Sequence, residues 1–450
     1  MLFLFSGLLS TLLTSQYIVH YFQIHMYPNS NLSTSEGSAC NVNTSTEVYH
    51  ERTTVQKTAS RFNIYFKLAD NLPALVTCGV IGGLSDRFGR TRVLTFTISL
   101  YFLCNCISSI IIYFEFSVYY LLIGNMLNGF GGGFYGVLSV GFAYISDVTR
   151  PGKQRTLMIT CLEAAIGIGA ALSGFVSGFV IQRVGFFYAN ICVCAATATS
   201  VLVIVLFLPH SRPRAMFIAK TSMFENARAS FIFYFQASPI RYKYVLGIIT
   251  FMTASLSLLG RPSTEILYQL NAPFCWTSVK VGYYTAISVS TSMILGVAIV
   301  KGLQIFFAEE IIAILSAISG MSAYTVEALA VDDVMLFMVP VIGFLNALVF
   351  PMVRSILSKL TPADRQGALF AGIAVVEIVA NLGSNVGASS IYAATVGTMR
   401  GLVFLVFASM SLLTACLLLV YRITKGRSKT VPIEDVNKDV TSTQIMEEKL

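Results

Sequence analysis

The sequence has little charge for its length. Only 12% of its 450 residues are Asp, Glu, Lys or Arg, whereas 55% are hydrophobic and the mean hydropathy is +0.72. Soluble domains carry about 25% charged residues, so this composition indicates a protein that spans a membrane. The four His and nine Cys residues do not occur at metal-ligand spacing. We therefore expect no metal or cofactor, and because no nucleophile–base pair occurs, we expect no enzyme.

Long apolar runs dominate the sequence instead. A helix needs about 20 mainly apolar residues to cross the hydrocarbon core, where only helices and closed barrels satisfy their backbone hydrogen bonds. Barrel strands would alternate apolar and polar residues, and these runs are continuous. They predict an all-α membrane protein with twelve transmembrane helices at 2–22, 63–84, 93–113, 118–146, 157–181, 186–208, 243–268, 281–304, 308–329, 333–357, 366–392 and 400–421. The first run lacks the basic flank and cleavage site of a signal peptide, so we interpret it as a transmembrane helix.

The positions of Lys and Arg predict the orientation, because cytosolic loops of membrane proteins are enriched in these residues. When the turn at 83–92 is placed in the cytosol, 22 of the 30 Lys and Arg residues fall on that side. Both termini are then cytosolic. The net charge of +8 therefore reflects topology and gives no reason to expect nucleic-acid binding.

A polar segment divides the chain into two similar parts. Residues 209–242 interrupt the hydropathy with prolines and basic residues. We expect an N-terminal six-helix bundle (1–208), a cytosolic linker (209–242), a C-terminal six-helix bundle (243–421) and a cytosolic tail (422–450). Two such bundles suit a transporter in which a site near the bilayer midplane opens alternately to either side.

The turn between the second and third runs reads GGLSDRFGR. It resembles the signature loop of the major facilitator superfamily. The resemblance implies the major facilitator fold and a cytosolic gating motif made by Gly82, Asp86, Arg87, Gly89 and Arg90. Asp86 can interact with a helix N-terminus, and Arg90 can pair with carboxylates across the bundle interface.

Segments along essentially the whole chain, including CLEAAIGIG, YQLNAPFCWTS and RSILSKLTPADRQGALF, are similar to the solute-carrier family that includes the proton-coupled folate transporter. This resemblance implies a proton-coupled symporter of a small, folate-like organic anion, with protons and membrane lipid as further partners. Two alternatives stay open. One is a lysosomal or endosomal facilitator of other amphipathic anions, such as steroid conjugates or cell-wall fragments, and the other is a receptor that does not transport. The plasma membrane is the expected location, with the lysosome or endosome as the alternative.

The same resemblance assigns roles to individual residues: proton coupling to Glu163 and Asp147, substrate binding to Arg354 and Arg400, a disulfide to Cys40 and Cys275, and glycosylation to Asn31 and Asn43. Both asparagines begin N-x-[ST] sequons in a loop that the topology places outside the cytosol. The chain departs from the family at Asn125, where the family has an arginine, and at Leu259, where it has a histidine.

Ionisable residues inside the apolar runs point independently to a transport path. Such a residue costs about 2.5–3.5 kcal/mol at the centre of a spanning helix, so it should face a cavity or a partner. Desolvation of Glu163 among Ala and Gly favours the protonated acid, which suits a proton carrier. Arg354 keeps its charge, so a carboxylate or an anionic substrate must balance it. The alternatives are a purely structural carboxyl group and an arginine that reaches to the membrane interface.

Spacing alone selects three further residues. Lys67 and Asp70 lie three residues apart on one helix face, where they can pair or bind solute. Glu377 forms a polar stripe with asparagines four and eight residues later, which favours a cavity-lining role in proton coupling. Glu327 lies near the outer end of a predicted helix, and we expect it to be solvated.

Overall fold

The structure, a computed structural model, describes residues 1–28, 47–209, 241–270, 273–276, 278–292, 296–362, 365–395 and 398–428. Ten helical spans in this part of the chain are long and apolar enough to cross a membrane. The predicted spans at 118–146 and 281–304 are each built from shorter helices, so the observed pattern agrees with twelve crossings. The all-α membrane fold is confirmed.

Two glycines shape the helices of the N-terminal half. These are α1 (Leu2–Met26), α2 (Glu47–Phe88), α3 (Arg90–Tyr113), η1 (Val118–Tyr120), α4 (Leu121–Phe130), α5 (Gly133–Val148) and α6 (Lys153–Phe207). Gly132, with φ of 85°, separates α4 from α5. Gly185, with φ of 76°, divides α6 into two spans. Such positive φ values favour glycine, which has no Cβ to clash with the backbone.

The C-terminal half contains more interrupted helices. These are α8 (Arg241–Leu259), α9 (Arg261–Leu270), α10 (Ser278–Ser290), α11 (Gly296–Phe306), α12 (Glu309–Ala328), α13 (Asp333–Ile342), η3 (Asn346–Leu348), α14 (Val349–Leu360), α15 (Gln366–Thr395) and α16 (Leu402–Ser428). The predicted span at 243–268 breaks at Gly260, where a Cβ would approach the Ser384 side chain of α15 to 2.9 Å. This break places the start of α9 inside the bundle.

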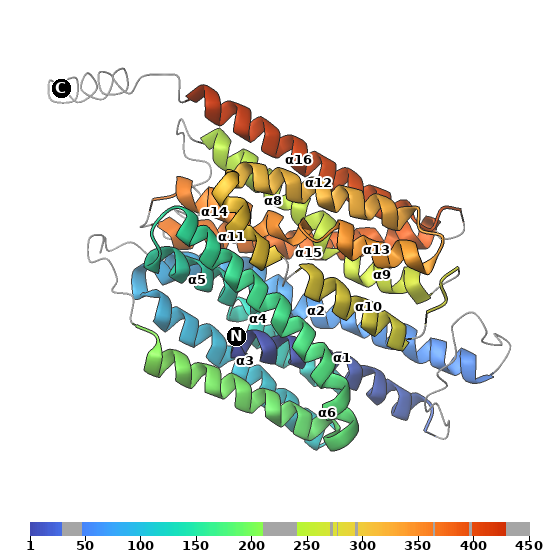
Figure 1. Cartoon of the computed structure of the whole chain (residues 1–450). Helices are drawn as coiled ribbons and strands as arrows, with labels where there is room; N and C mark the ends of the chain where they lie inside the picture. Colours follow the sequence, from blue (N-terminus) through green and yellow to red (C-terminus); the bar gives the residue numbers. More distant parts are fainter. Residues whose placement is uncertain are drawn as a thin grey trace, which may run out of the picture.

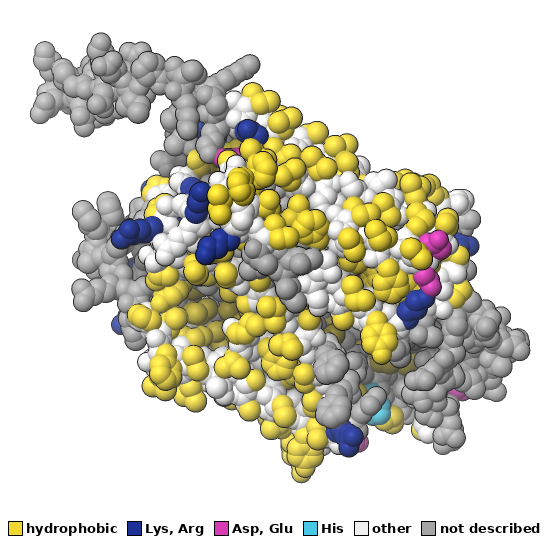
Figure 2. Space-filling model, in the orientation of Figure 1, with side chains coloured by type: hydrophobic (Ala, Val, Ile, Leu, Met, Phe, Trp, Pro, Cys, Tyr) yellow, Lys and Arg dark blue, Asp and Glu magenta, His cyan; other side chains and the backbone are white. Residues whose placement is uncertain are grey.

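The two halves lie side by side, with α1–α6 on one side and α8–α16 on the other (Figure 1). Hydrophobic side chains cover the middle of the visible face, and charged side chains gather toward its two ends (Figure 2). Large apolar side chains are exposed at Leu206 (70%), Phe207 (76%) and Phe306 (80%). Soluble proteins rarely expose so much apolar surface, so this surface fits the hydrocarbon core of a bilayer.

The halves pack together around α14. Its residues 349–358 are all buried, so this helix is covered by protein on every side. Its neighbours in the other half include α6, while α15 packs against α2 and α5. A polar side chain on α14 is therefore surrounded by protein, and an ionised one needs a partner nearby.

Candidate functional site

A guanidinium from the C-terminal half joins two carboxylates where the halves meet. Arg354 lies on α14, and its side chain is 1% exposed. Its Nη1 pairs with Oε1 of Glu163 on α6, and its Nη2 lies 2.6 Å from Oε1 of Glu377 on α15. Three residues selected separately from the sequence therefore converge on one centre. The ion pair with Glu163 connects the two halves directly.

Aromatic rings surround this centre. The guanidinium carbon of Arg354 lies 4.4 Å from the ring centroid of Phe142, 5.0 Å from that of Phe251 and 5.6 Å from that of Phe350. Ring faces attract a cation while they exclude water. With all three groups ionised, two carboxylates face one guanidinium, so the centre holds one excess negative charge. An unbalanced buried charge is costly.

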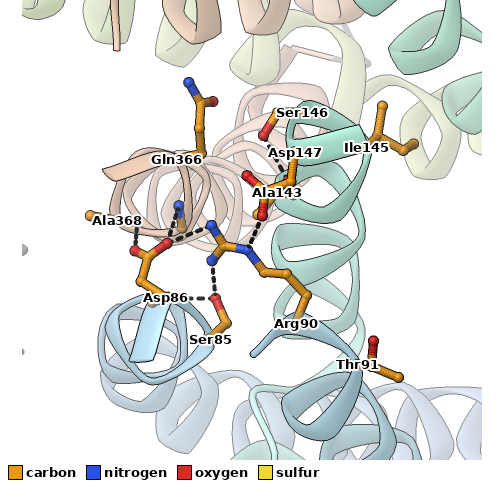
Figure 3. A network of polar contacts seen from close by, with 12 residues as sticks. Ser85, Asp86, Arg90, Thr91, Ala143, Ile145, Ser146, Asp147, Gln366 and Ala368 are labelled. Carbon is orange, nitrogen blue, oxygen red and sulfur yellow. Dashed lines mark hydrogen bonds and ion pairs between the residues drawn. The ribbon is translucent and has the colours of Figure 1, made fainter. Parts of the chain in front are cut away.

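A second polar network lies at the end of the molecule where α2 meets the start of α15 (Figure 3). Asp86 accepts hydrogen bonds from the N–H groups of Gly367 and Ala368, both at 3.2 Å, and its Oδ1 lies 2.5 Å from Arg90 Nη2. A carboxylate is stabilised at a helix N-terminus by the free N–H groups and the helix dipole. The gating motif of one half therefore caps a helix of the other half.

Arg90 is held on both sides within this network. Its Nε donates to Asp147 Oδ2 at 3.0 Å, and its Nη1 donates to Ser85 Oγ at 2.5 Å (Figure 3). A Cβ on Gly82 would overlap the carbonyl oxygen of Gly367, so α2 and α15 can approach this closely only with glycine there. We call the contacts of Asp86, Arg90 and Asp147 the latch.

The start of α6 adds further contacts between the halves at the latch end. Arg155 Nη1 donates to the carbonyl oxygen of Ser358 at 3.3 Å and to its Oγ at 3.1 Å. The hydroxyl oxygens of Thr156 and Ser355 are 2.5 Å apart. The molecule is therefore closed at the end that the distribution of Lys and Arg predicts to be cytosolic.

In the described part of the chain, the other predicted site residues form no ion pair with Arg354. Of the two alternatives that the spacing of Lys67 and Asp70 leaves open, the structure does not show the pairing: Asp70 Oδ1 accepts from Asn128 Nδ2 at 2.8 Å, and Lys67 is exposed. The neighbouring helix α4 offers Asp70 a nearer partner than its own helix does. Arg400 is exposed in the turn between α15 and α16, at the end of α15 remote from the latch.

Two members of the gating motif serve the turn itself. Gly89 has φ of 93° between α2 and α3, and the Arg87 guanidinium lies 5.5 Å from the ring centroid of Phe88. Positive φ explains the glycine at this position.

The predicted disulfide and glycosylation sites lie mostly beyond the described residues. Cys275 is disulfide-bonded, but Cys40, Asn31 and Asn43 lie outside the described residues. The Cys40–Cys275 pairing and the two glycosylation sites therefore stay predictions.

One buried charged cluster was missed by sequence reasoning. The expectation that Glu327 is solvated is wrong, because the side chain is 0% exposed and its Oε2 accepts from Arg261 Nε at 2.9 Å. Arg261 also pairs with Glu265, one helical turn away. That i, i+4 spacing of opposite charges within an apolar run was the available signal. The partner on α12 could not be foreseen without the fold.

Comparison with known proteins agrees with this architecture. The family described as Major Facilitator Superfamily matches residues 70–388. The lysosomal proton-coupled steroid conjugate and bile acid symporter of Gallus gallus is 28% identical over 425 residues, which cover 92% of this chain and 90% of that protein. The proton-coupled folate transporter of Bos taurus is 27% identical over 414 residues, which cover 90% of this chain and 87% of that protein.

Solved structures show the same fold. The human organic anion transporter MFSD10 superposes with a TM-score of 0.73 at 16% identity, covering 93% of this chain and 97% of that one. The E. coli fucose:proton symporter FucP superposes with a TM-score of 0.67 at 11% identity, covering 93% of this chain and 96% of that one. The chain belongs to the Major Facilitator Superfamily and is a membrane transporter, not an enzyme.

Proposed function

We propose that this transporter moves an organic anion together with protons by alternating access, and that the Arg354 centre couples the two. The observation that carries the proposal is the buried ion pair between Glu163 and Arg354. It joins the halves, and its Glu163 side chain is 16% exposed while Arg354 is 1% exposed. Of the two partners, Glu163 is therefore the more accessible.

Protonation of Glu163 changes the charge balance of the centre. The neutral acid no longer compensates Arg354, and the ion pair between the halves is lost. An anionic group of the substrate can then take the vacated place beside the guanidinium, which offers a planar set of donors suited to a carboxylate or sulfate. Proton and anion thus enter together, and their release on the other side restores the original pair. Glu377 stays with Arg354 on the C-terminal half throughout this cycle.

The latch supplies the gate in this scheme. Asp86, Arg90 and Asp147 hold the predicted cytosolic end closed while the proton and the anion bind from the other side. We assign Asp147 to gate closure, because its partner is Arg90. Arg400, Lys67 and Asp70 are proposed to contact solute on the path toward the centre.

The chemistry of the relatives supports an amphipathic organic anion as the substrate class. The related symporters carry steroid conjugates and bile acids, or folate, according to their names. These solutes combine an anionic group with a large apolar or aromatic body. The ring-lined Arg354 centre offers matching chemistry, with a cation among three phenylalanines. The lysosomal name of several relatives favours an acidic compartment as the place of action.

We expect uptake of labelled steroid sulfate or folate to rise as the outside pH falls. Each proton that must bind can raise the rate by up to about tenfold per pH unit. Uptake into cells that express the chain at their surface should be measured at acidic and at neutral pH, with empty-vector cells as the control. Equal specific uptake of every tested anion at both pH values would contradict proton coupling.

A further inference from the structure

The second charged cluster repeats the composition of the central site within the C-terminal bundle alone. Arg261 begins α9 directly after the helix break at Gly260. Its Nη2 lies 2.6 Å from Glu265 Oε1, and its Nε lies 2.9 Å from Glu327 Oε2 on α12. One guanidinium again faces two carboxylates, so the cluster holds one excess negative charge when both are ionised.

The geometry around Arg261 indicates how this charge is balanced. Both carboxyl groups pair with the same guanidinium, at 2.6 Å and 2.9 Å. Two ionised carboxylates held this close to one cation repel each other, which favours a proton on one of them. Glu327 Oε1 is buried and has no donor in the described part of the chain. A proton shared with Glu265 would supply the missing donor.

The surroundings favour a proton over a larger ligand. Glu327 is 0% exposed, whereas the side chains of Arg261 and Glu265 are 14% and 13% exposed. The carboxyl pair is therefore fully buried on the Glu327 side and more accessible at Glu265. Three tyrosines face the pair from the adjacent elements: Tyr268 on α9, Tyr284 on α10 and Tyr324 on α12. A fourth side chain, Arg400 before α16, interacts with Tyr268. None of these four side chains is an acid at neutral pH, so the carboxyl pair is the group that binds the proton.

We propose that Glu265 and Glu327 form a second proton-binding site, which Arg261 holds in the C-terminal bundle. A proton from water reaches Glu265 and is shared with Glu327, and Arg261 remains paired to both. The role of this site in transport rests on the proposed function, in which it adds a second proton to each cycle.

The chain contains its own reporter for this site. Its single tryptophan, Trp276, is 2% exposed, and its ring centroid lies 5.4 Å from that of Tyr284. Tyr284 OH in turn accepts a hydrogen bond from Arg261 Nη2 at 3.4 Å. A change in the protonation of the carboxyl pair therefore reaches the indole through one tyrosine.

We expect the fluorescence of Trp276 in the purified full chain to show a titration step that Glu327→Gln abolishes. The amide of the variant donates a hydrogen bond without titrating, so the emission should stay at the value of the protonated wild type. Glu265→Gln should abolish the same step. Because Glu265 is less buried than Glu327, this variant serves as a second test if Glu327→Gln does not fold. Glu163→Gln should keep the step, because its carboxyl belongs to the central site.

Two controls address other acids near the reporter. Trp276 Nε1 donates to Asp333 Oδ1 at 2.5 Å, so Asp333→Asn should leave the step that depends on Glu327 in place. Asp332→Asn removes the exposed acid next to Asp333 and should also leave the step in place. Asparagine caps α13 as well as aspartate does. A step that persists in both Glu327→Gln and Glu265→Gln, or no step in the wild type, would overturn the proposal.

Transport provides an independent readout. A plot of the logarithm of the uptake rate against the logarithm of proton concentration should have a slope of about two in the wild type. The slope should be about one in Glu327→Gln, since one proton-binding site is lost. If Glu327→Gln transports with an unchanged slope, the second site takes no part in the transport cycle. If uptake by the wild type does not depend on pH, the proposed function is contradicted. The fluorescence titration of Trp276 would still test the second site.

Discussion

Replacing Arg354 by Met is expected to abolish uptake and to destabilise the protein. The variant leaves Glu163 and Glu377 facing each other among phenylalanine rings without a cation. Removing one partner of a buried ion pair costs about 3–5 kcal/mol, and each 1.4 kcal/mol corresponds to about tenfold in an equilibrium. We therefore expect at least about a hundredfold loss of uptake and a lower melting temperature of the purified transporter.

The triple variant Glu163→Gln, Arg354→Met, Glu377→Gln separates stability from function. All three charges are removed together, so no unbalanced charge remains, and uncharged groups of similar volume can replace a buried ion pair without loss of stability. Its melting temperature should return toward that of the wild type, while proton-coupled uptake stays lost. Arg354→Lys keeps the charge but cannot pair with two carboxylates in the same planar geometry, so it should retain only weak uptake. Normal uptake by Arg354→Met would show that the arginine has no role in transport.

Replacing Asp86 by Ala is expected to open the latch end. The carboxylate accepts two backbone hydrogen bonds from the start of α15 and pairs with Arg90. A hydrogen bond to a charged group contributes about 1.5–3 kcal/mol, so losing these contacts should shift the gate toward the open state by about tenfold to a hundredfold. Uptake from the opposite side should fall, because the state with the latch closed becomes rare.

The opening can be measured as a distance between the halves. Spin labels at the exposed positions Gln154 and Pro362, in a background whose other cysteines are replaced, report the separation of α6 from the end of α14. The Asp86→Ala variant should populate a longer distance than the wild type. Arg92→Gln removes an exposed charge from the same turn and serves as the control with the wild-type distance. Identical distance distributions in Asp86→Ala and the wild type would show that the latch does not hold the gate.

The helices of this fold were predictable because lipid imposes a simple rule on them. Every spanning segment must be long, apolar and helical, so hydropathy alone located the crossings. Interruptions were harder to foresee. The break at Gly260 depends on which helices approach closely, and only the packed structure shows that Gly260 lies against Ser384.

The members of the central site were also predictable, but their partners were not. A charge inside an apolar run is rare enough to single out Glu163, Arg354 and Glu377. Their mutual pairing joins α6, α14 and α15, and no sequence spacing relates residues on three separate helices. The same reason explains the error at Glu327, because its place near a helix end does not reveal its partner Arg261 on α9.

Proton-driven accumulation by Glu163→Gln tests the central claim most directly. Purified wild type and variant should be reconstituted into vesicles, and two reactions compared: exchange of labelled for unlabelled anion without a gradient, and accumulation driven by an imposed proton gradient. We expect the variant to retain exchange, because Arg354 still binds the anion, and to lose accumulation, because no proton is bound or released at position 163. Accumulation at the wild-type level in Glu163→Gln would contradict coupling through this ion pair.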